Sequence, residues 1–266
     1  MLPDQTQGMG SLRSLHVRRV TAGDVRSALS AGLKDFFRKP LLSGFFGLVY
    51  ALFGLVFIAG LVVFDQIWMI VPAGVGFPPI APFVAVGLYE MSRRYKANES
   101  FSWKDIFLVI FKQQRREFGW MAFVVLFVFW VWIYQIRLLL ALFLQWQSFS
   151  SLQSFFEIVT STTNGLLFIG IGTVVGGILA TILFCLTVIA MPLLLDKEID
   201  FVSAMLLSIK TVQTSPVVML GWGLTVALIV FLAILPAFAG VLFALPILGH
   251  ATWHLYERAI GDAPTG

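Results

Sequence analysis

Six long apolar stretches constrain this chain more than any other feature. They cover roughly 41–64, 68–91, 119–142, 165–190, 216–235 and 237–256. A helix needs about 20 apolar residues to cross a bilayer core about 30 Å thick, and each stretch is long enough to do so. We therefore expect an all-α, polytopic membrane protein with six transmembrane helices. A very short turn at Pro236 separates the last two.

The composition agrees with a membrane protein. The chain has 266 residues, of which 59% are hydrophobic and 12% are charged. Ordinary soluble domains are about 45–50% apolar and about 25% charged. A soluble fold of this size could not hide so much apolar surface, which excludes a soluble enzyme and a disordered chain. The single cysteine, Cys185, excludes an intrachain disulfide and a cysteine-based metal cluster.

The distribution of Lys and Arg predicts the orientation in the membrane. Of the 18 Lys and Arg residues, only Arg137 falls in a segment predicted to face outward. Basic loops stay in the cytoplasm, so both termini should be cytoplasmic in a bacterial inner membrane. We expect no cleaved signal peptide, because residues 1–40 are polar and basic and the apolar run after them is too long. Residues 1–20 should form a flexible basic arm.

An internal repeat organises the single membrane domain, 21–260, into three parallel units, about 21–96, 99–197 and 198–260. Each unit has a transmembrane hairpin preceded by a short amphipathic, interfacial helix. At an offset of 176, Lys34 and Pro40 match Lys210 and Pro216, whereas the middle unit matches more weakly. The expected interfacial helices are Asp24–Lys39, Ser102–Arg116 and Phe201–Thr214. Capping boxes are expected at Thr21/Asp24 and Ser102/Asp105, and an N-cap at Asp200.

Two histidines on the last span are the main candidates for chemistry. His250 and His254 are four residues apart and so share a helix face, which Glu257 extends. Such a pair can bind Zn²⁺ or Cu²⁺, but two ligands do not complete a site. We therefore favour hydrogen bonding near the cytoplasmic interface and expect no metal, cofactor or catalytic residue. A redox or metal protein that uses this pair is a third, weaker hypothesis.

A set of charged and aromatic residues is expected at the cytoplasmic interface. Glu90 and Glu257 should form local ion pairs there with neighbouring arginines, and no acidic residue is expected at the middle of a span, which disfavours a proton relay. The full set is Arg38, Lys39, Tyr89, Glu90, Arg93, Arg94, Lys112, Arg115, Arg116, Lys210, Tyr256 and Glu257.

Small residues recur every fourth position in the fourth span, at Gly172, Gly176 and Ala180. Such a stripe lets two membrane helices approach closely. We interpret it as an internal packing surface, with a surface for a partner protein as the alternative.

Three stretches carry a family resemblance that extends over about residues 20–260. RSALSAGLKDFFRKPLLSGFFGLVYALFGL (26–55), APFVAVGLYEMSRR (81–94) with SWKDI (102–106), and GHATWHLYE (249–257) resemble a family of uncharacterised bacterial integral membrane proteins. Some of its members carry the label cytochrome c oxidase subunit I. The catalytic label fails here, because an oxidase needs about six histidine ligands for two haems and a copper, and this chain has two in its predicted spans. An accessory role beside an oxidase survives that test.

The sequence therefore favours a non-catalytic accessory or scaffold protein that packs beside another membrane complex, respiratory or otherwise. The alternative is a transporter or channel for a small or lipid-like solute, which would need convergent polar groups near mid-depth. The expected partners are membrane lipids with anionic headgroups at the cytoplasmic face and a second membrane protein, with no role for nucleic acid.

Overall fold

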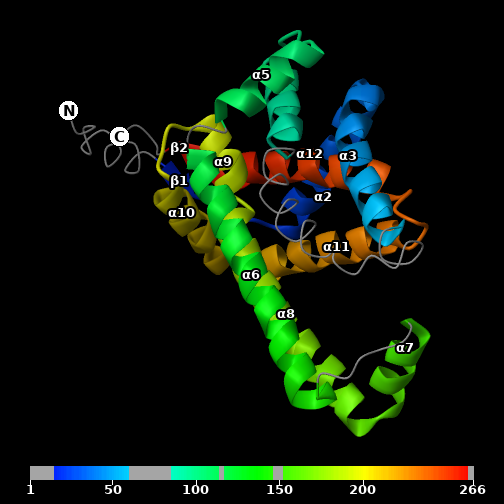
Figure 1. The fold of residues 1–266 in the computed structure, drawn as a ribbon. Coiled ribbons are helices and arrows are strands. Elements are labelled where there is room, and N and C mark those ends of the chain that lie inside the picture. The colour runs from blue at the N-terminus through cyan, green and yellow to red at the C-terminus, as the bar shows by residue number, and fades with distance from the viewer. Residues whose placement is uncertain (1–14, 60–84, 114–116, 146–151, 263–266) are drawn as a thin grey trace, which may run out of the picture.

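The computed structural model describes residues 15–59, 85–113, 117–145 and 152–262, and the described chain is built almost entirely of helices (Figure 1). The elements are β1 (Leu15–Val17), α2 (Ala22–Arg38), α3 (Pro40–Ile58), α5 (Trp103–Gln113), α6 (Glu117–Leu144), α7 (Leu152–Ser161), α8 (Thr163–Thr187), α9 (Ala190–Asp196), α10 (Phe201–Thr214), α11 (Pro216–Ile234), α12 (Val241–Ala259) and β2 (Ile260–Asp262). Residues 85–96 are also helical.

Three of the described helices are long and apolar enough to cross a membrane: α6, the combined stretch Thr163–Asp196, and α11. A fourth is obtained if α2 and α3 count as one span, but they are bent by 104° where they meet. α12 coincides with the predicted sixth span but is not among these candidates, and most of the predicted second span lies outside the described residues. The all-α membrane class is thus confirmed, whereas six spans remain a prediction.

Helices occur at all three positions where short interfacial helices were expected, namely α2, α5 and α10. The Thr21/Asp24 capping box is present, and hydrogen bonds from Thr21 lower the pKa of Asp24. Asp105 accepts hydrogen bonds from the backbone and the hydroxyl of Ser102. Asp200 caps α10 by accepting from the backbone of Ser203, as predicted. These ends were predictable because capping depends only on residues a few positions apart.

The last residues of the predicted basic arm pack against the rest of the chain. Leu15–Val17 pairs antiparallel with Ile260–Asp262, and Val17 and Val20 are buried. The backbone N–H of Val20 also donates to the hydroxyl of Ser215, at 2.9 Å. This pairing could not be predicted from the sequence, because its two three-residue strands come from opposite ends of the chain. Residues 1–14 of the arm lie outside the described part.

α12 is the helix around which the N-terminal half packs. It contacts α2 and α3 along its length, and glycines mark the two crossing points. A β-carbon at Gly32 would lie 2.6 Å from the backbone nitrogen of Ala251, and one at Gly47 would lie 2.5 Å from the carbonyl oxygen of Leu242. Only glycine lets the backbones approach this closely, so α2 and α3 are held tightly against α12.

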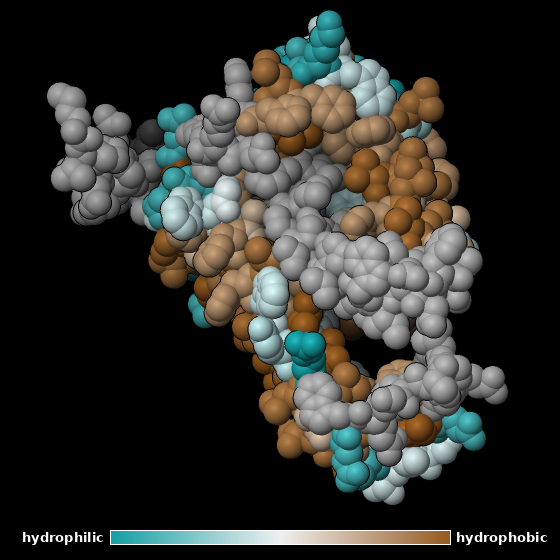
Figure 2. Space-filling model, in the orientation of Figure 1, coloured by the Kyte–Doolittle hydropathy of each residue, from teal (hydrophilic) through white to brown (hydrophobic). Residues whose placement is uncertain are grey.

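The α6–α8 hairpin extends away from the rest of the molecule, with α7 at its far end (Figure 1). Only 11% of the most apolar window of α6 is buried. Figure 2 shows brown, apolar side chains along one edge of the described part of this hairpin, and pale or teal ones on its front and at its far end. The hairpin therefore exposes a large apolar surface, as expected for a segment that lies in lipid or against another membrane protein.

Candidate functional site

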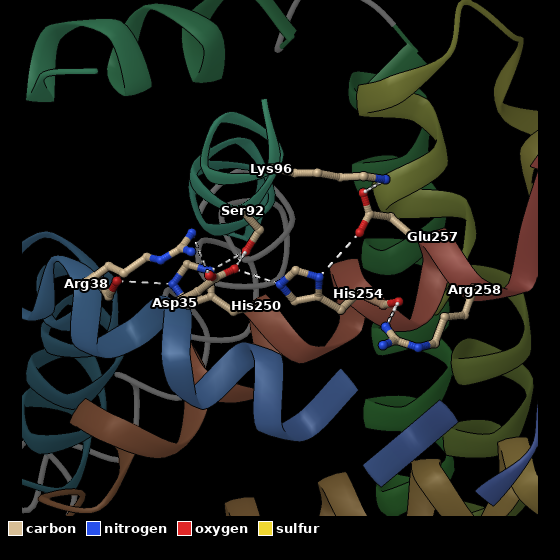
Figure 3. Close-up of polar contacts among 9 residues, drawn as sticks. Asp35, Arg38, Ser92, Lys96, His250, His254, Glu257 and Arg258 are labelled. Atoms are coloured by element: carbon tan, nitrogen blue, oxygen red, sulfur yellow. Dashed lines mark hydrogen bonds and ion pairs between the residues drawn. The ribbon is translucent and has the colours of Figure 1, made fainter. Parts of the chain in front are cut away.

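A buried polar network joins three parts of the chain that are distant in sequence: the consecutive helices α2 and α3, the helix over 85–96, and α12 (Figure 3). His250 and His254 lie one turn apart on α12. Asp35 of α2 and Ser92 of the 85–96 helix meet these histidines. The α2 helix can bring a carboxylate this close because Gly32, one turn before Asp35, removes the side chain from the contact with α12.

His250 is hydrogen-bonded through both ring nitrogens. Its Nε2 lies 3.1 Å from the Ser43 hydroxyl, and its Nδ1 lies 2.7 Å from the Ser92 hydroxyl. Ser92 donates its single proton to the Asp35 carboxylate at 2.9 Å. Ser92 must therefore accept from Nδ1–H of His250, which leaves Nε2 as the acceptor for Ser43. A ring protonated only at Nδ1 satisfies both contacts, and full burial favours this neutral form over a charged ring.

His254 has a different charge state. Its Nε2 lies 2.7 Å from Asp35 Oδ2, and its Nδ1 lies 3.3 Å from Glu257 Oε2. Both nitrogens face carboxylate oxygens, which only accept, so both must donate and the ring is positively charged. Lys96 donates to the other oxygen of Glu257 at 2.8 Å, and Arg38 lies 3.4 Å from Oδ1 of Asp35.

The network runs from the interior to the surface. Ser43, Ser92 and His250 are fully buried, whereas the Lys96 side chain is 66% exposed. Ser43 and His250 resemble a nucleophile and base in their contact, but the burial of Ser43 denies a substrate access to its hydroxyl. Because buried polar groups are costly unless they are paired, these mutual contacts explain how the charges are tolerated.

The predicted metal candidates do not converge on one point. His250 turns toward two serines, and His254 lies between two carboxylates. In the part of the chain that the structure describes, no group of three or more His, Cys, Asp or Glu side chains is arranged to hold a metal ion.

The basic residues at the end of α2, Arg38 and Lys39, bind aromatic residues in the segment 95–101. Arg38 stacks its guanidinium 5.0 Å from the centre of the Tyr95 ring. Lys39 donates to the carbonyl of Phe101 at 2.7 Å and lies over the ring of that residue. These contacts keep the start of α3 beside residues 95–101, with each cation held against an aromatic ring.

Glu90 is fully buried and forms the local ion pairs that the sequence predicted. Arg93 binds both of its carboxylate oxygens, at 2.7 and 2.9 Å, and Arg94 binds one of them at 2.6 Å. Tyr89 is buried beside Trp253 of α12.

Glu257 has other partners than its neighbouring arginine. It pairs with Lys96 and His254, whereas Arg258 lies 3.7 Å from Asp24. Glu257 thus has a local partner, His254, but the partner is not the neighbouring arginine that the sequence suggested.

The remaining interface residues are scattered. The Tyr256 hydroxyl donates to Asp196 at 2.7 Å, and Lys210 is exposed on α10. Arg115 and Arg116 lie outside the described residues, as does the side chain of Lys112.

The small-residue stripe of α8 faces two neighbours. β-carbons at Gly172 and Gly176 would meet Leu139 and Trp132 of α6, at 3.5 and 3.6 Å. Ala180 instead lines a groove of about 330 Å³ between α8 and α11. Gly172 and Gly176 thus lie against α6 of the same chain.

Asp35, Ser43 and Ser92 were not singled out in the sequence. Asp35 did carry a signal, because it lies seven residues after Ala28 and three after Gly32, at the edge of the apolar face of α2. A carboxylate at that edge suggests a partner on the helix that covers the face. The two serines carried no comparable signal.

The long apolar helices and their buried charges define a multi-pass helical membrane protein. Residues 70–196 match the family described as predicted integral membrane protein (DUF2189). This match confirms the expected resemblance to an uncharacterised membrane family and gives no support to the oxidase label. No curated protein and no solved structure matches the chain.

Proposed function

We propose that the chain crosses the membrane six times, as three hairpins that each begin and end on the same side. Lys39, just before α3, binds the carbonyl of Phe101, which supports a first hairpin that begins and ends on the same side. Glu117, at the start of α6, accepts from the backbone of Phe201, which follows the α6–α8 pair. Two residues on opposite sides of a bilayer core about 30 Å thick cannot touch each other, so these contacts favour an even number of crossings in each interval.

The third hairpin follows from the same reasoning. Ser215, just before α11, binds Val20, and the adjacent β1 strand pairs with β2 after α12. If α11 crosses once, α12 must cross back.

A repeat relationship supports this topology. α3 and α11 are each 19 residues long, and each begins with a proline, at positions 176 residues apart. The residues before these prolines, Lys39 and Ser215, have φ of −140° in both cases and ψ of 72° and 59°. The same turn thus connects an interfacial helix to a spanning helix twice, which favours a duplicated unit.

Reporters fused to the two ends of the chain should place both termini on the same side of the membrane. We expect green fluorescent protein to fluoresce at either terminus in a bacterial host, because the basic segments keep both ends in the cytoplasm. Alkaline phosphatase inserted between α7 and α8 should be active, since that turn lies at the end of the α6–α8 hairpin away from Glu117 and is therefore expected outside the cytoplasm. Ends on opposite sides of the membrane would contradict the proposed topology.

We propose that the protein is a non-catalytic accessory or scaffold component of the bacterial inner membrane, and that α6 contacts another membrane protein. The observation that carries this proposal is an exposed aromatic stripe. Phe123, Phe127 and Tyr134 are each about 60% exposed, and Trp130, on the same face, is 37% exposed. Aromatic side chains are enriched where proteins bind one another.

The polar network argues against the transporter alternative. Its histidines and carboxylates bind one another, which leaves them little capacity to bind a solute. A transport site needs convergent polar groups in a hydrated cavity.

Photo-crosslinking tests the scaffold proposal. A photoreactive amino acid at Phe127 should give one discrete protein adduct in native membranes. The matched control is Phe231 of α11, which is 61% exposed and should give lipid adducts only. Lipid adducts at both positions would contradict the proposal. Flux of protons or K⁺ through liposomes that contain only this protein would favour the transporter instead.

A further inference from the structure

A pocket of about 540 Å³ opens where four separate segments of the chain meet. It lies beside the polar network and shares Lys96 and Glu257 with it. Its charged lining residues are Arg18, Arg93, Lys96, Asp196, Lys197 and Glu257. All of these come from segments whose basic residues predict a cytoplasmic location. The volume is in the range of known small-molecule sites.

Cations outnumber acids in this pocket, and the two acids already have partners. Asp196 accepts from the Tyr256 hydroxyl at 2.7 Å and lies 3.8 Å from Lys197. Glu257 is shared by Lys96 and the charged ring of His254. Arg93 is also paired, because it binds Glu90, which lies outside the lining. The four cations of the pocket therefore stand against three acids, and the remaining positive charge favours an anion.

Arg18 is held in place by the backbone at the C-terminus. The backbone N–H of Arg18 donates to the carbonyl of Ala259 at 2.8 Å, next to the β1–β2 pairing. Its guanidinium lies against Gly261, where a β-carbon would be 2.5 Å from one terminal nitrogen. The absence of a side chain at Gly261 thus creates the space in which this cation sits.

A buried donor also lines the pocket. Trp253 is 1% exposed, and its indole N–H has no hydrogen-bond acceptor among the described residues. A buried donor without an acceptor is rare in folded proteins, and a bound ligand is one way to satisfy it.

We propose that this pocket binds a phosphate monoester group, carried either by a lipid headgroup or by a small soluble phosphate. A phosphate dianion has three terminal oxygens and matches a pocket with several Arg and Lys donors. Binding places the phosphate among Arg18, Lys96 and Lys197, between the four chain segments that line the pocket.

The test uses the full-length protein in an uncharged maltoside detergent. Isothermal titration calorimetry with inorganic phosphate and with dihexanoyl phosphatidate separates the two sources, and dihexanoyl phosphatidylcholine is the diester control. We expect Arg18→Gln and Lys197→Gln each to weaken binding at least about tenfold, because a charge-assisted hydrogen bond is lost. Lys104→Gln, which removes an exposed lysine from α5, should leave binding unchanged.

Gly261→Ala provides a variant that keeps the net charge. It should weaken phosphate binding, since the new methyl group displaces the Arg18 guanidinium. Binding of both phosphate probes identifies a site for soluble phosphates, and binding of phosphatidate alone identifies a lipid site. The proposal is overturned if neither probe binds, if phosphatidylcholine binds as well as phosphatidate, or if the pocket variants bind like wild type.

Discussion

Asp35→Asn is expected to lower the free energy of unfolding by about 3–5 kcal/mol, the usual cost of removing one partner of a buried ion pair. Asp35 is 4% exposed and accepts hydrogen bonds from Ser92 and His254 through a single oxygen. An asparagine cannot balance the charge of His254, and its amide group cannot accept at every position. Denaturation of the purified protein by a graded addition of sodium dodecyl sulfate would measure the loss.

Asp24→Asn is the matched control, because Asp24 lies on the same helix but near the surface. It weakens a helix cap and should cost about 1 kcal/mol. The double variant Asp35→Asn/His254→Gln removes both charges and should be less destabilised than the sum of the two single variants by about 1–3 kcal/mol. A loss below about 1 kcal/mol for Asp35→Asn, or simple additivity, would show that the pair is not coupled as the geometry requires.

Local features of the fold were predictable from the sequence. The caps at Thr21, Ser102 and Asp200, and the pairing of Glu90 with Arg93, involve residues no more than four positions apart. Helix geometry alone brings such residues together, so spacing is enough to identify them. The apolar helices were predictable for a related reason, since bilayer thickness sets their length.

The site itself could not be assembled from the sequence, because its contacts are long-range. Ser43 and His250 are 207 residues apart, and Ser92 and Asp35 are 57 apart. Predicting these contacts requires knowing that α2 packs on α12, which depends on the backbone approach at Gly32. The same limit explains the wrong partner for Glu257, because Lys96 approaches it from another helix.

The neighbours of each histidine in the network determine its charge. The two histidines share a helix face and differ only in their neighbours, yet one is neutral and one is charged. Serines surround His250 and carboxylates surround His254. α12 can therefore pack a neutral ring deep against α2 while the charged ring stays close to the surface, where Lys96 and Arg38 complete the balance.

Ser92→Ala should be the most damaging loss of a single hydroxyl, at about 2–4 kcal/mol of unfolding free energy. The change removes a donor to Asp35 and leaves Nδ1–H of His250 buried without an acceptor, and each of these defects is costly. Ser43→Ala is the matched control, because it removes one hydroxyl from the same histidine and leaves only an unfilled acceptor. It should cost about 1–2 kcal/mol.

The expectation that Ser92→Ala costs more unfolding free energy than Ser43→Ala depends on which nitrogen of His250 carries the proton. The chain has three histidines, so nitrogen-15 spectra of the labelled protein can be assigned with His250→Gln and His254→Gln. We expect one neutral ring protonated at Nδ1 and one doubly protonated ring at neutral pH. If His250 were instead protonated at Nε2, Ser92 would have to donate one proton both to that ring and to Asp35. In that case Ser43→Ala would be the costlier change, and the network as described would be wrong.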